Sequence, residues 1–162
     1  MEIREATADD WPAIWPFFRE IVAAGETYTF DPGITSEGAR QLWMVHDQPM
    51  HVAVAATDAR VVGTANVYPN RGGPGSHVAT ASFMVDPACA GHGIGRALGE
   101  HIVTTARRLG FRAIQFQAVV ATNTAAVNLW TSLGFEIVGT IPEAFEHPTA
   151  GYVGLHVMYL RL

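Results

Sequence analysis

Apolar residues recur along the chain at two different periods, and the change from one period to the other predicts the secondary structure. The first apolar stripe has the i, i+3, i+4, i+7, i+8 spacing of one helix face. Segments 51–57, 61–68 and 78–85 are instead rich in β-branched and aromatic residues, as strands are. The chain therefore mixes helices and strands. The helical stripe consists of Ile14, Phe17, Phe18, Ile21 and Val22.

Turn and capping residues divide the rest of the chain into further elements. A helix that crosses over between strands 78–85 and 112–120 makes those two strands parallel within a mixed α/β (α+β) sheet. With 162 residues, the chain is expected to form one domain over 1–162. The remaining predicted elements are a strand over 1–6, helices over 7–25, 36–43, 93–109 and 123–133, a hairpin connection at 58–60, and strands over 136–141 and 152–160.

Three alternating glycines stand between strand 78–85 and the helix that follows it, in the segment Ala-Gly-His-Gly-Ile-Gly-Arg over 90–96. The first turn of a helix leaves backbone N–H groups unpaired, so phosphate can bind there without a lysine. The chain has no lysine and thus no Walker loop. A dinucleotide fingerprint that starts at Gly91 or Gly93 would place Arg96 or Leu98 where the third glycine belongs.

A second motif lies downstream, Asn-x-x-Ala-x-x-Leu-Trp-x-x-Leu-Gly-Phe over 123–135. Together with the glycine loop, and in this order, it resembles the two signatures of the GCN5-related N-acetyltransferase (GNAT) superfamily. The resemblance implies the GNAT fold, with a mixed central sheet of about seven strands and four helices. In that fold the parallel pair of strands splays apart and binds acetyl-CoA, which serves as co-substrate.

The resemblance also implies which residues meet acetyl-CoA. The strand before the loop offers backbone groups to the pantetheine arm, and the loop surrounds the pyrophosphate. The implied contacts are Phe83, Met84 and Val85 for the arm, Gly91, His92, Gly93, Ile94, Gly95 and Arg96 for the pyrophosphate, Asn123 beside the arm and Trp130 over the thioester.

Two positions depart from the superfamily pattern. Ala90 replaces the Arg or Gln that usually opens the loop, so phosphate binding must depend on backbone amides, His92 and Arg96. Trp130 stands where many relatives have a tyrosine that is proposed to protonate the departing thiolate. An indole cannot be that acid, but a thiol with a pKa near ~8.5 leaves readily as an anion.

Attack by an amine on the thioester requires the neutral amine. An alkyl amine with a pKa of ~10.4 is neutral in about one molecule in 2,500 at pH 7, so such an acceptor needs a base. A backbone N–H near Val85 would hold the developing oxyanion. We favour Glu26 as the base, because it lies in the segment that commonly walls the acceptor site in the superfamily. The other candidates are Asp31, His77, Glu143 and His147.

The carboxyl-terminal third resembles a GNAT subgroup that acetylates proline analogues, with phosphinothricin-type enzymes as more distant relatives. The resemblance implies substrate contacts from Gln117 and from Thr80, and we add Tyr28 and Tyr152, with Tyr159 as a further tyrosine. Three hypotheses stay open: an N-acetyltransferase for a small amine such as an amino or imino acid, a protein or peptide N-acetyltransferase, and a non-catalytic acyl-CoA-binding module.

Composition narrows the possible partners. A net charge of −5 without a basic cluster argues against nucleic acid. No apolar run approaches the ~20 residues of a membrane span, and the amino terminus lacks a secretion signal, so we expect a cytoplasmic protein. The single cysteine, Cys89, and the histidines show no metal-ligand spacing, so no metal is expected. An edge strand or the carboxyl-terminal strands could form a homodimer, as is frequent in the superfamily.

Overall fold

The computed structural model describes residues 1–45, 49–58 and 60–162, and its centre is a seven-stranded sheet in the order β1-β2-β3-β4-β5-β7-β6. Ala59, part of the predicted connection at 58–60, lies outside the described residues. The observed sheet and its four helices confirm the predicted fold class. The strands are β1 (Glu2–Glu5), β2 (His51–Ala56), β3 (Val61–Pro69), β4 (Val78–Val85), β5 (Ala113–Val120), β6 (Glu136–His147) and β7 (Gly151–Arg161).

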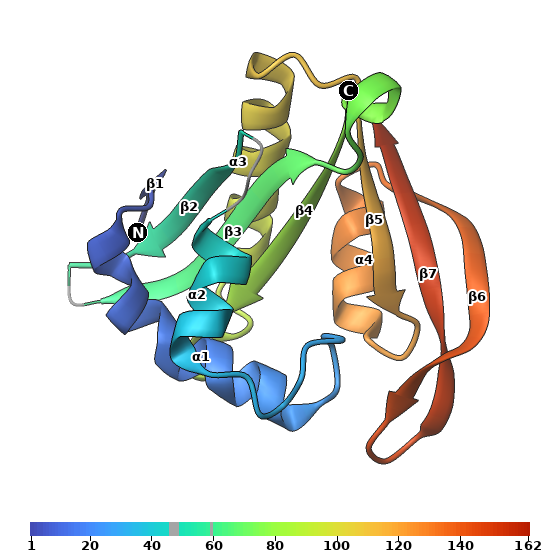
Figure 1. The fold of residues 1–162 in the computed structure, drawn as a ribbon, viewed down its shortest axis with the longest axis horizontal. Helices are drawn as coiled ribbons and strands as arrows, with labels where there is room; N and C mark the ends of the chain where they lie inside the picture. The colour runs from blue at the N-terminus through green and yellow to red at the C-terminus, as the bar shows by residue number, and fades with distance from the viewer. Residues whose placement is uncertain (46–48, 59) are drawn as a thin grey trace.

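Helices cover both faces of the sheet. Helices α1 (Trp11–Ala24) and α2 (Ser36–Met44) lie on one face, and α3 (Ile94–Arg108) and α4 (Thr124–Ser132) lie on the other (Figure 1). Each face has its own hydrophobic cluster, one built around α1 and α2 and one around α3 and the end of α4. The two pairs of helices therefore bury their apolar faces against opposite sides of the sheet.

The amino-terminal helix begins later than its sequence suggests. Residues 8–10 form a 3₁₀ turn, and α1 starts at Trp11. The Asp10 carboxylate accepts the Thr7 backbone N–H at 2.7 Å and pairs with Arg4 at 2.6 Å, which ties this turn to β1. A proline in the first turn of α1, Pro12, sits where a missing N–H costs nothing and fixes the helical start there.

The parallel strands β4 and β5 pair over a very short stretch. Only Val78 with Ala113 and Ala79 with Ile114 are in register, and beyond Ala79 the two strands diverge. Figure 1 shows both strands starting side by side near the carboxyl terminus and separating toward their far ends. The splayed parallel pair implied by the resemblance is thus present.

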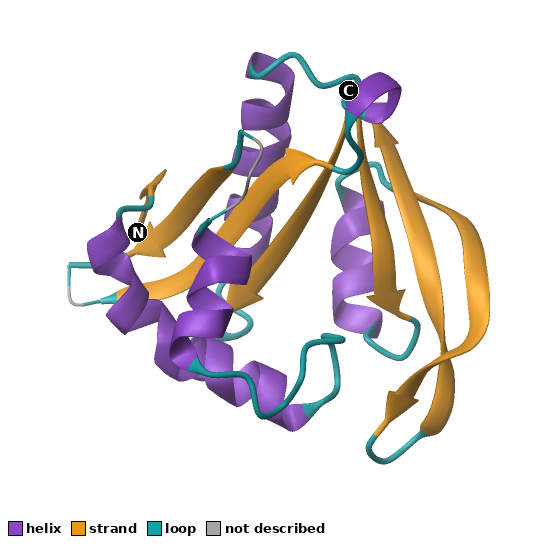
Figure 2. Ribbon diagram, in the orientation of Figure 1, coloured by secondary structure: helices purple, strands orange, loops and turns teal. Residues whose placement is uncertain are grey.

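Strand β6 is longer than predicted. The prediction ended it at Ile141 because Pro142 follows, but the strand continues to His147 as one arm of a hairpin with β7 (Figure 2). Between Ile141 and Phe145 the register shifts, and Glu143 adopts a φ of 52° within that irregular stretch. Such a bulge lets the ladder pass the proline, which lacks an N–H.

Among the described residues, no helix has both the length and the apolar character needed to span a membrane.

Candidate active site

The glycine loop leaves unpaired backbone N–H groups at the amino terminus of α3, where an anion can bind. Gly91 and Gly93 have φ values of 79° and 78°, a conformation that residues with a Cβ rarely adopt. Gly93 is the N-cap, and within the described residues no side chain caps the helix. The first backbone bond of α3 runs from the Ala97 N–H to the Gly93 carbonyl, so the amides of residues 94–96 precede the helical ladder. These amides and the helix dipole favour negative charge.

The two side chains expected to assist the loop are held by other protein groups. The Nδ1 atom of His92 lies 2.9 Å from the Ala90 carbonyl oxygen, so its imidazole braces the loop from within. The Arg96 guanidinium donates to Ser132 Oγ at 2.8 Å and lies 3.7 Å from the Glu100 carboxylate. Backbone amides are therefore the main donors that the loop offers.

Along β4, the backbone N–H and C=O groups of every second residue point into the splay. Phe83 makes both of its backbone hydrogen bonds with the Tyr28 hydroxyl, so its N–H and C=O point away from β3. In an antiparallel pair the next residue points the other way, and Met84 therefore faces its β3 partner Thr64. The expectation that Met84 offers backbone groups to a ligand is corrected: Phe83 and Val85 face the splay, whereas Met84 does not.

Trp130 closes the α3–α4 side of the splay. Its ring centroid lies 4.5 Å from that of Phe83 on β4 and 5.0 Å from that of Phe116 on β5. Phe116 in turn stacks on Phe135 at 4.2 Å. Only 7% of the Trp130 surface is exposed. The indole is thus a packing group that joins the two diverging strands.

Asn123 and Glu26 come from distant parts of the chain and line the same hollow. This cavity of ≈ 260 Å³ lies between the segment after α1 and the start of α4. The Asn123 side chain is also the N-cap of α4, because its Oδ1 accepts the Ala126 N–H at 3.1 Å. His147, a second candidate base, lines the same hollow. The lining residues are Glu26, Thr27, Thr122, Asn123, Thr124, Ala125 and His147.

Thr80 and Gln117 have different partners in the structure. Thr80 is the β4 partner of Tyr68 on β3, whereas Gln117 on β5 donates its amide N–H to the Asn70 side-chain oxygen. Asn70 follows β3, so this bond spans from the β3–β4 connection to β5. Asn70 could not be predicted from the sequence, because nothing in a loop of polar residues marks one of them as the partner of a strand residue 47 positions away.

Tyr152 lies apart from these groups. It pairs with Glu146 near the tip of the β6–β7 hairpin, and 66% of its surface is exposed. It does not line the hollow at Glu26. The hairpin thus extends Tyr152 into solvent rather than toward the splay.

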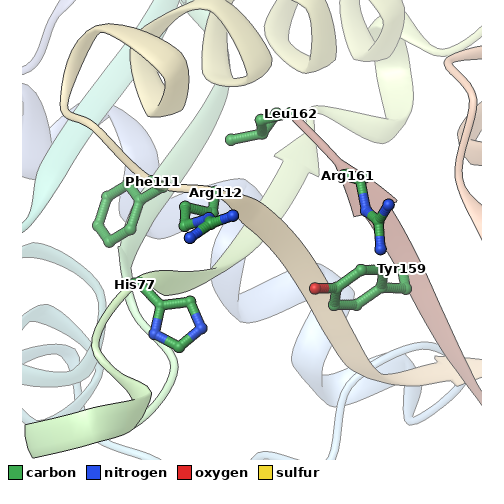
Figure 3. Close-up of a pocket in the computed structure, with 6 residues that line it drawn as sticks. All are labelled: His77, Phe111, Arg112, Tyr159, Arg161 and Leu162. Atoms are coloured by element: carbon green, nitrogen blue, oxygen red, sulfur yellow. The ribbon is translucent and has the colours of Figure 1, made fainter.

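A larger hollow of ≈ 490 Å³ lies at the closed end of the splay, where β4 and β5 begin (Figure 3). His77, a third candidate base, and two arginines, Arg112 and Arg161, point into it together with the Tyr159 ring. The glycine loop follows the opposite end of β4. The length of β4 therefore separates His77 from the glycine loop.

Among the described residues, no group of three or more His, Cys, Asp or Glu side chains is arranged to hold a metal ion.

The comparison with known families decides the classification. Residues 3–135 match the acetyltransferase (GNAT) family. The chain belongs to this family. The matched residues make up most of the GNAT chain and include the glycine loop, the splayed strands and α4. The family agrees with the enzyme class expected from the sequence, an N-acetyltransferase.

Solved structures similar to this GNAT chain cover it almost completely. A GCN5-related N-acetyltransferase from Kribbella flavida is 61% identical, with a TM-score of 0.96, over 99% of this chain and 97% of that one. A ribosomal-protein-alanine N-acetyltransferase from Brucella melitensis is 27% identical, with a TM-score of 0.89, over the whole of both chains. The yncA protein from Salmonella typhimurium, solved with its cofactor acetyl-CoA, is 27% identical, with a TM-score of 0.85, over 100% of this chain and 94% of that one.

A curated relative, the N-acetyltransferase aca1 of Schizosaccharomyces pombe, is 35% identical over 95 residues. This alignment covers 57% of the present chain and 46% of aca1, so the chain matches less than half the length of that relative.

Proposed function

We propose that the protein transfers the acetyl group of acetyl-CoA to the amine of a small molecule, an amino or imino acid. The observation that carries this proposal is the open edge of β4 between residues 79 and 85, which leads directly to the uncapped amides of residues 94–96. An elongated ligand with an amide-bearing arm and a pyrophosphate fits such an edge and cradle. The yncA structure, which holds acetyl-CoA on a similar fold, supports this reading.

The amine nitrogen attacks the thioester carbon, the carbon–sulfur bond breaks, and CoA leaves as a thiolate. Backbone N–H groups on the splayed edge of β4, from Phe83 or Val85, hold the oxyanion that develops on the carbonyl. No side chain has to protonate the thiolate, because a thiol with a pKa near ~8.5 is a good leaving group. Trp130, packed between Phe83 and Phe116, shields this centre from the α4 side.

Glu26 accepts the proton that the amine loses, either directly or through one water. Glu26 and Asn123 line the same hollow, and in this proposal the base meets the cofactor arm there. The hollow of ≈ 260 Å³ suits a compact acceptor better than a folded protein surface. Gln117, whose side-chain amide is bonded to Asn70, is a further proposed acceptor contact, although neither residue lines this hollow.

A second function is acetylation of a peptide or protein amine. The similarity to the ribosomal-protein-alanine N-acetyltransferase from Brucella melitensis favours it, since that chain aligns over its whole length. A peptide acceptor needs a groove, and the hollow at Glu26 is bordered only by the segment after α1 and by α4 and His147.

Thiol release from acetyl-CoA, measured across a panel of acceptors, tests these alternatives. The panel contains proline analogues, amino-acid analogues such as phosphinothricin, polyamines and short peptides with free amino termini. Turnover restricted to amino or imino acids supports the proposal, and turnover of peptides alone supports the second function. Acetyl-CoA binding without turnover of any acceptor would contradict both and favour an acyl-CoA-binding module.

We also propose that the outer edge of β6 pairs with a second copy of the chain. This strand has a neighbour on one side only, β7, and it exposes Ile137, Val138 and Ile141. Exposed apolar residues on an unpaired strand are a common basis for association. A closed symmetric dimer would cover the same edge in both copies.

A further inference from the structure

The phenol hydroxyl of Tyr28 forms hydrogen bonds with the backbone of β4 at the centre of the splay. It donates to the Phe83 carbonyl oxygen at 2.6 Å and accepts the Phe83 N–H at 3.1 Å. One side chain thus takes both backbone groups of a residue on the edge that β5 leaves open beyond Ala79. A neighbouring strand, or a ligand that imitates one, would normally make these two bonds.

The core holds the Tyr28 ring in this position. The ring stacks on Phe30 with centroids 5.2 Å apart and planes 13° apart, and it meets the edge of Trp43 at 6.2 Å. Phe30 stacks in turn on Phe18 of α1. Burial raises the pKa of the Tyr28 hydroxyl far above its ordinary value, so the phenol stays protonated and keeps its donor.

A backbone N–H makes one strong hydrogen bond at a time. A ligand carbonyl can accept the Phe83 N–H only after the Tyr28 hydroxyl has released it. The acetyl-CoA site proposed above uses this same edge of β4. The phenol and the thioester arm are therefore alternative partners for one peptide group.

We propose that Tyr28 is a positioning residue that closes the thioester end of the cofactor cleft in the free protein and gives up Phe83 when acetyl-CoA binds. The inference rests on the proposed function, because it needs acetyl-CoA in the splay. Glu26 lies two residues before Tyr28 and lines the acceptor hollow. Displacement of the phenol moves the segment that carries Glu26. Cofactor binding therefore changes the position of Glu26 in the acceptor hollow.

Tyr28→Phe removes the competing hydroxyl and keeps the stacked ring. We expect this variant to bind acetyl-CoA about threefold to tenfold more tightly than the wild type, since two modest hydrogen bonds no longer have to break. The Tm of the free variant falls, because the Phe83 peptide loses its partner. Isothermal titration calorimetry with acetyl-CoA measures the first effect and thermal unfolding measures the second.

Ser36→Ala is the matched control. It removes the acceptor of the 3.0 Å bond from Trp11 Nε1, which joins α1 to α2 in the same helical layer, and it leaves the Tyr28 bond in place. The control should lower the Tm without tightening acetyl-CoA binding. Unchanged or weaker binding by Tyr28→Phe would overturn the role of Tyr28, and equal tightening by Ser36→Ala would overturn it as well.

Amide exchange in the free wild-type protein gives a second test that does not depend on the folding of a variant. We expect slow exchange at Phe83, although no strand covers it, and slow exchange at Ser82 and Met84, whose partners are on β3. Fast exchange at Phe83 alone would overturn the inference. If the wild type binds no acetyl-CoA, the proposed function fails too; if it binds and Tyr28→Phe does not tighten binding, only the role of Tyr28 fails.

Discussion

Two of the strand edges that lack a neighbouring strand, one on β4 and one on β6, differ in what surrounds them. The inner edge, on β4 beyond Ala79, is enclosed by Tyr28 on one side and by Trp130 on the other. The outer edge, on β6, has exposed residues along nearly its whole length. Both edges present backbone groups, but only the inner edge presents them inside a packed frame.

The difference shows that the environment, and not the strand itself, decides what an edge binds. At the inner edge Tyr28 bonds to the Phe83 backbone and Trp130 packs against both Phe83 and Phe116, so this frame suits a thin ligand rather than a strand. At the outer edge nothing limits the approach, and another chain can pair there. We therefore propose the inner edge for the cofactor and the outer edge for self-association.

The largest effect is expected where the inner edge meets the glycine loop. Gly93→Asp places a carboxylate against the pyrophosphate and forces an aspartate into a φ of 78°. We predict at least a 100-fold rise in the Kd for acetyl-CoA, about 2.7 kcal/mol of lost binding free energy. Calorimetric titration with acetyl-CoA measures it.

Gly110→Asp controls for backbone strain in this experiment. Gly110 follows the other end of α3 and has a φ of 85°, so the aspartate is equally strained but far from the loop. If Gly110→Asp weakens acetyl-CoA binding as much as Gly93→Asp does, the loop is not the phosphate site.

The next largest effect concerns the base at the wide end of the inner edge. Glu26→Gln keeps the shape of the hollow but removes the proton acceptor, and we predict a fall of about 100-fold in kcat/KM for the best amine of the panel. The Kd for acetyl-CoA should stay unchanged. Glu20→Gln, an exposed change on α1, is the control. A loss of less than twofold for Glu26→Gln would transfer the base role to His147 or to solvent.

A charge introduced on the outer edge should weaken self-association, whereas the inner edge should not be affected. Ile141→Lys introduces a cation on an edge residue that is 54% exposed, and we predict at least a tenfold weaker dimer, measured by sedimentation equilibrium. Leu109→Lys, with 53% exposure at the end of α3, should leave association unchanged. A monomeric wild type would refute the assignment of the outer edge.

The smallest effect is a pH dependence that belongs to neither edge. His51 of β2 and His101 of α3 approach each other with Nε2 atoms 3.3 Å apart, and burial lowers the pKa of both imidazoles. Glu5 opposes the shift at His51, and Arg108 adds to it at both histidines. Because the folded state favours neutral imidazoles, this contribution to stability is complete above pH 6.5 and is lost as the pH falls below it.

We therefore predict that the Tm falls by about 2 °C between pH 7.5 and pH 5.5 in the wild type and by less in His101→Gln. Acetyl-CoA binding should hardly change over this interval, since the pair lies on β2 and α3 away from the splay. An equal fall in Tm in both proteins would show that other groups cause the acid sensitivity.

The sequence predicted the elements whose hydrophobic period is long and uninterrupted. The α1 stripe, strand β4 and the glycine loop before α3 all appear close to their predicted places. The predicted strand β6 ended before Pro142, whereas the observed strand continues. A bulge that carries a strand past a proline depends on pairing with β7 and leaves no local signal in the sequence.

Contacts between distant segments could not be predicted in the same way. The bond from Tyr28 to the Phe83 backbone joins residues 55 positions apart, and an aromatic residue in a loop gives no indication of which strand it meets. The Gln117–Asn70 contact has the same character. The side chains of the candidate site were therefore partly recognised by family resemblance, whereas their mutual arrangement needed the fold.

Amide hydrogen exchange of the whole chain, recorded with and without acetyl-CoA, shows whether the cofactor binds along the inner edge. We predict that acetyl-CoA slows exchange at Val85 and at residues 91–96, keeps Phe83 protected, and leaves the outer edge over residues 136–147 unaffected. Protection along β6 without protection at the glycine loop would instead place the cofactor away from the splay between β4 and β5 and refute the proposed site.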